Sequence, residues 1–190
     1  MPAATIILTL VIRIYDAYGV GAREVKTAEE VSTAILREAG IEPLWIRCDA
    51  GREREGTASS PCREAPRPDE VLIRIAAAPR ARPDVDTLGF AYVDTSTEGG
   101  SLATVFADRI ALLADAAQID PGILLGRAMA HEIGHLLLGT TTHEARGLMR
   151  ARWTPALLRH RNASDWLFSR DERERLTGKL AIARDSRCAP

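Results

Sequence analysis

The apolar residues of the chain follow two spacings, one typical of strands and the other of helices, in alternating segments. Residues 5–15 are rich in β-branched side chains and predict a buried strand. Thr27 and Glu30 have the spacing of a capping box and predict a helix that ends before Gly40. Residues 49–69 lack periodicity and predict a surface loop. Short strands are expected on either side of this loop, at 44–47 and 71–75.

The second half of the chain predicts a pair of strands and then mainly helices. Residues 88–94 and 101–109 predict the two strands, which are joined by a turn with two consecutive glycines. An added helix is expected at 109–117, between the second of these strands and the next helix. Two C-terminal helices are expected, one from Thr154-Pro155 and one capped by Ser169 and Glu172 that runs to about Arg184.

A longer apolar helix between these segments carries the candidate chemistry. Asp120 is its expected N-cap and Pro121 lies in its first turn, so the helix should extend for about 18 residues. It contains His131, Glu132 and His135 in the pattern H-E-x-x-H. Two imidazoles four residues apart lie on one helix face and can bind one zinc ion. The carboxylate between them can deprotonate a water molecule instead of binding the metal.

A third histidine follows the end of this helix. Three of the four histidines of the chain lie between positions 131 and 143. Gly139 can turn the chain back so that His143 approaches the same ion. A catalytic zinc usually takes three protein ligands and leaves the fourth position to water, which fits this set. The alternative for His143 is a solvated loop histidine.

The segment from 131 to 149, HEIGHLLLGTTTHEARGLM, resembles the signature of the metzincin clan of metalloproteases. That signature is H-E-x-x-H-x-x-G-x-x-H followed by a methionine turn. In this chain the glycine comes one residue later and the last histidine two residues later. Met149 falls at about the separation from the first histidine that matrix metalloproteinases have. The resemblance therefore implies that Met149 supports the metal site from below, whereas the alternative is an ordinary core methionine.

The resemblance covers about residues 5–153 and implies a fold. It implies an α/β domain whose twisted mixed sheet has about five strands, a backing helix and the zinc-site helix. Residues 88–94 would form the antiparallel edge strand that lines the substrate cleft. We expect one metalloprotease domain over 1–190, with residues 1–139 as the upper subdomain. The lower subdomain, residues 140–190, would be small and helical and would carry the third ligand and the methionine turn.

The same resemblance implies a zinc-dependent endopeptidase that hydrolyses peptide or protein substrates. Zn²⁺ would be held by His131, His135 and His143, and Glu132 would act as general base and then as proton donor. An extended peptide would bind antiparallel to the edge strand by strand addition. The expected substrate-binding residues are Gly89, Phe90, Ala91 and Tyr92 of that strand, together with Arg150 and Arg152. Residues 150–153 would wall the pocket for the side chain that follows the cut.

Two other interpretations of the motif remain open at this stage. In a gluzincin, a glutamate from a later helix replaces the third histidine, and Glu172 and Glu174 are the candidates. In a non-catalytic zinc-stapled interaction domain, a fourth protein ligand would close the coordination sphere. No residue near the motif is an obvious fourth ligand, because Glu144 is adjacent to His143 and Cys188 is remote in sequence.

Composition restricts the partners of the chain. Its net charge is −1, and its arginines are interspersed with acidic residues. This balance gives no basis for binding nucleic acid. No apolar run reaches the length of a transmembrane helix, so no membrane partner is expected. We expect a monomer.

The cysteines bear on the compartment. Cys48 and Cys62 flank the irregular loop and either close it as a disulfide or remain reduced. The first fifteen residues lack the cationic start of a signal peptide. The protein then stays in the cell or lacks a leader in this chain, and the cysteines slightly favour a secreted or extracytoplasmic location. Arg187-Cys188 is similar to the pair with which matrix metalloproteinase propeptides block their zinc; an incidental tail cysteine is the alternative.

Overall fold

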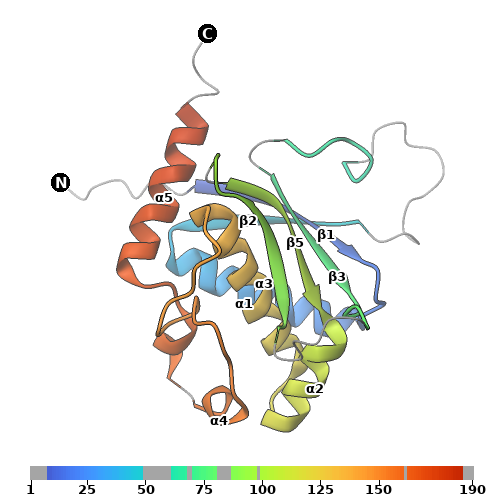
Figure 1. Cartoon of the computed structure of the whole chain (residues 1–190). Helices are drawn as coiled ribbons and strands as arrows, with labels where there is room; N and C mark the ends of the chain where they lie inside the picture. Colours follow the sequence, from blue (N-terminus) through green and yellow to red (C-terminus); the bar gives the residue numbers. More distant parts are fainter. Residues whose placement is uncertain are drawn as a thin grey trace.

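The computed structural model describes residues 8–48, 61–67, 70–80, 87–97, 99–160 and 162–185. One strand and one helix come first, four strands follow in succession, and the rest of the described chain is helical (Figure 1). The strands are β1 (Leu8–Asp16), β2 (Ile41–Arg47), β3 (Glu70–Ala76), β4 (Gly89–Asp94) and β5 (Gly99–Phe106). The α-helices are α1 (Ala22–Glu38), α2 (Ala107–Ala117), α3 (Pro121–Leu138), α4 (Pro155–Leu158) and α5 (Arg170–Asp185), with a short 3₁₀ helix at Ala163–Trp166.

The five strands form one mixed sheet in the order β2-β1-β3-β5-β4. β1 pairs in parallel with β2 and β3, and β3 pairs in parallel with β5. β4 pairs antiparallel with β5 alone and is therefore an edge strand. The expected α/β class, the mixed sheet and the antiparallel edge strand are all confirmed.

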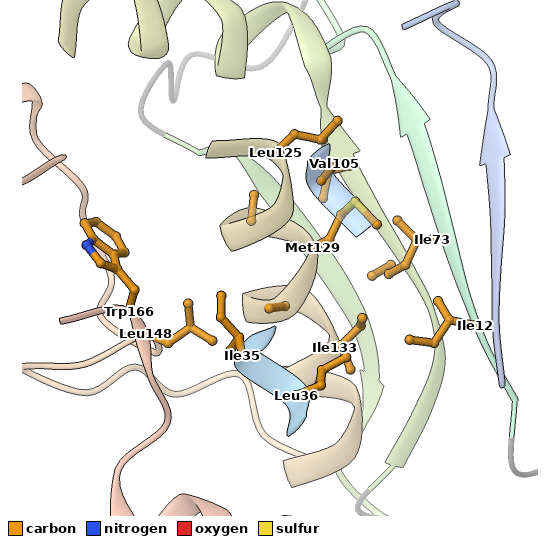
Figure 2. Packing of buried hydrophobic residues seen from close by; sticks show 14 of the residues in the cluster. Ile12, Ile35, Leu36, Ile73, Val105, Leu125, Met129, Ile133, Leu148 and Trp166 are labelled. Atoms are coloured by element: carbon orange, nitrogen blue, oxygen red, sulfur yellow. The ribbon is translucent and has the colours of Figure 1, made fainter. Parts of the chain in front are cut away.

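The core lies between one face of this sheet and α1 and α3. Alternate residues of β1, such as Ile12 and Ile14, point toward the helices and are fully buried. Figure 2 shows Leu125, Met129 and Ile133 of α3 directed toward the strands. Leu148 and Trp166 pack on the opposite side of α3. The helix is therefore enclosed by the sheet on one side and by the C-terminal segment on the other.

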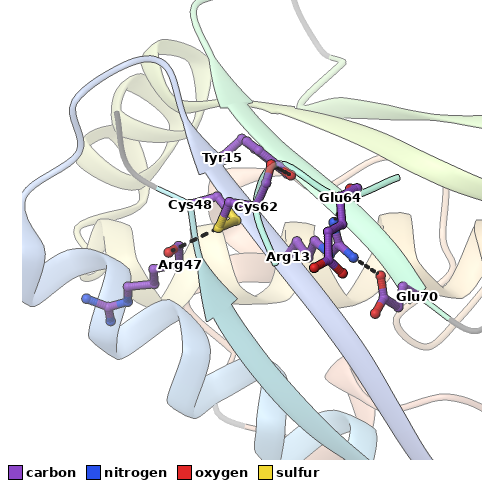
Figure 3. Close-up of a disulfide and its surroundings, with 7 residues drawn as sticks. All are labelled: Arg13, Tyr15, Arg47, Cys48, Cys62, Glu64 and Glu70. Carbon is purple, nitrogen blue, oxygen red and sulfur yellow. Dashed lines mark hydrogen bonds and ion pairs between the residues drawn. A yellow bond between two sulfur atoms is a disulfide. The ribbon is translucent and has the colours of Figure 1, made fainter. Parts of the chain in front are cut away.

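A buried ion pair and a disulfide hold residues 61–67 close to β1 (Figure 3). Arg13 is 1% exposed, donates to the Glu64 carbonyl and pairs with the Glu70 carboxylate. Cys48 and Cys62 form a disulfide, which settles the alternative left open by the sequence. Disulfides persist in oxidising environments. The rest of the expected loop at 49–69, apart from residues 61–67, lies outside the described residues.

Two helix boundaries differ from the sequence prediction. α1 begins at Ala22, so Thr27 lies inside the helix and its hydroxyl donates to the Arg23 carbonyl one turn back. The predicted capping box at Thr27 is wrong, because Gly21 with its extended backbone precedes the first turn instead. α2 likewise begins directly after β5, at Ala107 rather than Arg109.

One strand is also longer than predicted, since β2 begins at Ile41 and includes Pro43. An edge strand tolerates proline because part of its backbone needs no partner. Among the described residues, no helix combines the length and hydropathy that a membrane span requires.

We predict that Glu70→Gln lowers the free energy of unfolding by about 3–5 kcal/mol, because it leaves the buried Arg13 charge without its partner. Urea unfolding of the two proteins measures the difference. Glu42→Gln is the matched control, since it breaks the exposed pair of Glu42 with Arg37 and should leave the midpoint nearly unchanged. Equal midpoints for Glu70→Gln and the wild type would contradict a structural role for the buried pair.

Candidate metal centre

Helix α3 positions the first two histidines, and both of its ends follow the predicted signals. The Asp120 carboxylate accepts a hydrogen bond from the Gly122 amide at 2.8 Å, and Pro121 occupies the first turn. Gly139 ends the helix in the left-handed conformation with a φ of 64°. His131, Glu132 and His135 are all buried, so the helix carries three polar side chains into the interior.

The turn at Gly139 brings His143 to the other two histidines. The Nε2 atoms of His131 and His135 are 3.1 Å apart, and those of His135 and His143 are 3.2 Å apart. One nitrogen from each ring lies within 4.8 Å of the others, a spacing at which one metal ion can be held. The structure therefore brings together the three histidines that the sequence singled out.

Backbone carbonyls orient two of these rings. His131 Nδ1 lies 2.9 Å from the Leu148 carbonyl, and His135 Nδ1 lies 2.8 Å from the Thr140 carbonyl. A carbonyl only accepts hydrogen bonds, so each Nδ1 carries the proton and each Nε2 presents a lone pair. Two lone pairs that face each other at this distance repel unless a cation lies between them. The donor set therefore fits a metal ion, and the carbonyls act as the partners that metal-binding histidines usually have.

The surroundings keep the three imidazoles in their neutral form. Burial lowers the pKa of His131 to about 3, and the neighbouring His135 ring adds to this shift. Burial likewise lowers the pKa of His135 to about 4, and it lowers the pKa of His143. The neutral imidazole is the form that binds metals.

Glu132 lies beside the histidines with an unpaired carboxylate. Its Oε2 atom is buried and has no hydrogen-bond partner among the described residues. Burial raises the pKa of this carboxyl to about 8. Because a buried, unpaired carboxylate is costly, its position is more favourable if a cation lies nearby. A larger residue at Gly89 would displace it, since a Cβ there would lie 2.8 Å from Oε1.

His131, Glu132 and His143 open onto a cavity of about 280 Å³. Gly89, Arg150 and Arg152 of the predicted substrate-binding set also line it. The remaining lining residues are Thr87, Leu88, Ala128, Ala151 and Trp153. Leu88 lies within the edge strand expected at 88–94, just before the observed start of β4, whereas Thr87 and Ala128 were not among the expected residues. Ala128 had a detectable signal, because it lies three residues before His131 on the same helix face.

The other predicted substrate residues lie along β4. Tyr92 is 57% exposed at the sheet edge, and Phe90 packs between the Tyr92 and Phe106 rings. Ala91 is half-buried in the same strand. Arg150 is held by the Gly147 carbonyl at 2.9 Å and by Asp165 at 3.4 Å. The edge strand β4 therefore lies next to the cavity, which Gly89 at its first position lines.

Met149 packs against α3. It is 1% exposed, and its sulfur approaches Gly134, between the two helical histidines. The turn before it depends on Gly147, whose φ is 75°. Leu148, the residue whose carbonyl orients His131, is held by its amide to the Leu167 carbonyl at 3.0 Å. The turn at residues 147–149 therefore contacts both α3, through Met149, and the His131 ring, through the Leu148 carbonyl.

Glu172 and Glu174 do not join the histidine group. Glu172 caps α5 by exchanging hydrogen bonds with Ser169, which confirms the predicted capping box. Glu174 pairs with Arg170 on the exposed face of α5. Neither carboxylate is therefore placed to replace His143. Cys188 lies outside the described residues.

Comparison with family models and with curated proteins finds no match to this sequence. Solved structures do match. The chain is similar to archaemetzincin from Methanopyrus kandleri, with a TM-score of 0.58 and 15% identity over 95% of this chain and 98% of that one. The chain has the same fold. It is also similar to metalloproteinase-II from Bacteroides fragilis, with a TM-score of 0.54 and 14% identity over 94% of this chain. It spans 55% of the length of that second protein.

We predict that Gly134→Ala lowers the free energy of unfolding by about 1–3 kcal/mol, although alanine favours helices. The new Cβ would lie 2.6 Å from the Met149 sulfur and 2.7 Å from Phe168 Cε1, where both side chains are buried. Gly178→Ala is the control, because open space surrounds that exposed helix position and the change should stabilise by about 0.5–1 kcal/mol. Urea unfolding compares the three proteins. A Gly134→Ala protein as stable as the wild type would show that Met149 does not pack closely under α3.

Proposed function

We propose that this protein is a zinc-dependent endopeptidase. The observation that carries the proposal is the convergence of three histidine ring nitrogens beside a buried, unpaired carboxylate in a cavity at the sheet edge. The fold shared with an archaemetzincin and with a metalloproteinase supports it. The variant metzincin signature and the position of Met149 under the site support it further.

His131, His135 and His143 would hold the ion through Nε2. When bound, zinc supplies a Lewis acid that polarises a carbonyl and makes water a better nucleophile near neutral pH. The Glu132 carboxylate would accept the proton of the attacking water and later donate it to the leaving amine nitrogen. Trp153 contacts the His131 ring edge to face at 5.5 Å and limits the movement of that ring.

Substrate would bind as an added strand along β4. An edge strand presents unpaired backbone groups that an extended peptide can pair with. Gly89, where β4 begins, lies next to Glu132, so the strand would deliver a peptide bond to the carboxylate. Arg150 to Trp153 would wall the pocket for the side chain after the cut, and the 280 Å³ cavity is lined by these residues.

A non-catalytic zinc staple explains the site less well. Such a site needs a fourth protein ligand, which closes the coordination sphere. Among the described residues, the group able to hold a metal contains only the three histidines, and two of them border a cavity. An unpaired carboxylate beside the ligands also has no role in a closed structural site. These features favour catalysis.

We predict that His143→Ala weakens zinc binding by more than about a hundredfold, because even the loss of a group behind a ligand costs about 10–100-fold. Competition with a chelator measures the affinity. His160→Ala is the matched control, since it removes the one histidine that lies outside the group. If His143→Ala and His160→Ala bind zinc equally well, His143 is not a ligand.

We predict that Glu132→Gln retains zinc but lowers kcat/KM for peptide hydrolysis by about two to four powers of ten. The amide keeps the shape of the side chain and cannot accept the proton. Glu144→Gln serves as the control, because this exposed glutamate neighbours the site. Cleavage of a peptide library followed by mass spectrometry measures both variants. If Glu132→Gln cleaves as fast as the wild type, Glu132 is not the general base.

A further inference from the structure

A second cavity, of about 670 Å³, adjoins the candidate active site. It lies between residues 78–80, α2 and the start of α4, and α2 and α4 are in contact at one end of the sheet (Figure 1). Leu88, Arg152 and Trp153 line both cavities. These three residues therefore form the boundary across which a bound molecule passes from one cavity to the other.

The direction of a bound peptide decides which of its residues enter this second cavity. A peptide antiparallel to β4 runs from the Asp94 end of the strand toward Gly89. Gly89 lies beside Glu132, so the cut occurs near this end. The residues after the cut then continue past Leu88, which is the boundary of the second cavity. The second cavity therefore faces the C-terminal side of the scissile bond.

The charged groups of the second cavity are mostly positive. Arg80, Arg109 and Arg152 line it, and arginine keeps its charge at all relevant pH values. Among the described residues of the lining, Asp108 is the one acidic residue, and its carboxylate accepts the Ala78 amide at 2.9 Å. The described lining residues therefore carry a net positive charge.

Two of these arginines have different roles. Arg109 is held in place, because it donates to the Thr87 carbonyl at 2.8 Å and its guanidinium lies 5.2 Å from the centre of the Phe106 ring. Arg152 is exposed at the boundary, and no ion pair or hydrogen bond of its side chain occurs within the described part of the chain. Its planar fork is thus available to bind a carboxylate through two parallel hydrogen bonds.

We propose that the second cavity binds a carboxylate of the substrate on the C-terminal side of the cut, and that Arg152 is the specificity-determining residue. This inference rests on the proposed peptidase function. The carboxylate belongs to an aspartate or glutamate side chain, or to the C-terminus of a short substrate. Both sources present the same chemistry to Arg152.

Matched peptides test the proposal. One internally quenched peptide carries Gln at the second and third positions after the cut, and otherwise identical peptides carry Glu or Lys there. For the wild-type protein with zinc, kcat/KM for the Glu peptide should exceed that for the Gln peptide by about tenfold, the factor that corresponds to one good charged contact. Arg152→Glu should abolish this ratio and favour the Lys peptide. Arg175→Glu, the same charge change on exposed α5, should keep the wild-type ratio.

Peptides with different C-terminal groups show whether the bound carboxylate comes from a side chain or from the chain terminus. Gln peptides that stop at the second or third residue after the cut are compared with a free carboxylate and with an amide. A preference for the free acid alone assigns the site to a chain terminus, and a preference for the Glu peptide assigns it to a side chain. Equal rates for all peptides with the wild type, or a preference for the carboxylate that persists unchanged in Arg152→Glu, would overturn the proposal.

A binding measurement separates this proposal from the peptidase function. Fluorescence anisotropy of the labelled Glu and Gln peptides is measured with Glu132→Gln, and again with the same variant that also carries Arg152→Glu. Tighter binding of the Glu peptide that depends on Arg152 supports the carboxylate subsite even if the wild type cuts no peptide. If the protein cleaves neutral peptides and shows no preference for acidic ones, the proposed peptidase function stands and the carboxylate subsite is rejected.

Discussion

The packing of α3 on all of its sides is the constraint on which the rest of the structure depends. Toward α1, the helix backbone comes so close at Gly126 that a Cβ would lie 2.6 Å from the Ala28 carbonyl, and Ser32 donates to the Gly126 carbonyl. On the opposite side, Gly134 admits Met149 and Phe168. The core therefore packs around this helix. The polar side chains of His131, Glu132 and His135 are buried as a result.

That burial explains the arrangement of the candidate metal centre. Buried polar groups need partners, and the C-terminal segment supplies carbonyls for the Nδ1 atoms of His131 and His135. It also supplies the third imidazole, so this segment both covers α3 and completes the donor set. Among the described residues, the Glu132 Oε2 atom has no hydrogen-bond partner, and the histidine Nε2 atoms face one another, an arrangement that a bound cation would make favourable.

Local signals in the sequence predicted the elements that carry the site. Asp120, Pro121 and the glycine at 139 act within one helical turn, so the bounds of α3 could be predicted from neighbours alone. The capping box at Thr27 failed, because any threonine three residues before a glutamate has that pattern, whether it lies at a helix start or inside it. The disulfide could not be predicted from spacing, because Cys48 follows β2 and Cys62 lies in the segment 61–67, which hydrogen bonds from Arg13 and Tyr15 hold against β1. These contacts join residues that are far apart in the sequence.

The sequence by itself determined that two histidines and Glu132 lie close together, because their relative positions depend only on the fixed geometry of a helix. It also indicated the edge strand and the turn at Gly139, which follow from local composition. Only the tertiary structure decided that His143 reaches the same point, that carbonyls of Leu148 and Thr140 set the ring tautomers, and that a second, arginine-lined cavity adjoins the first. These features join residues that lie far apart along the chain or in irregular backbone, where no periodicity constrains their distance.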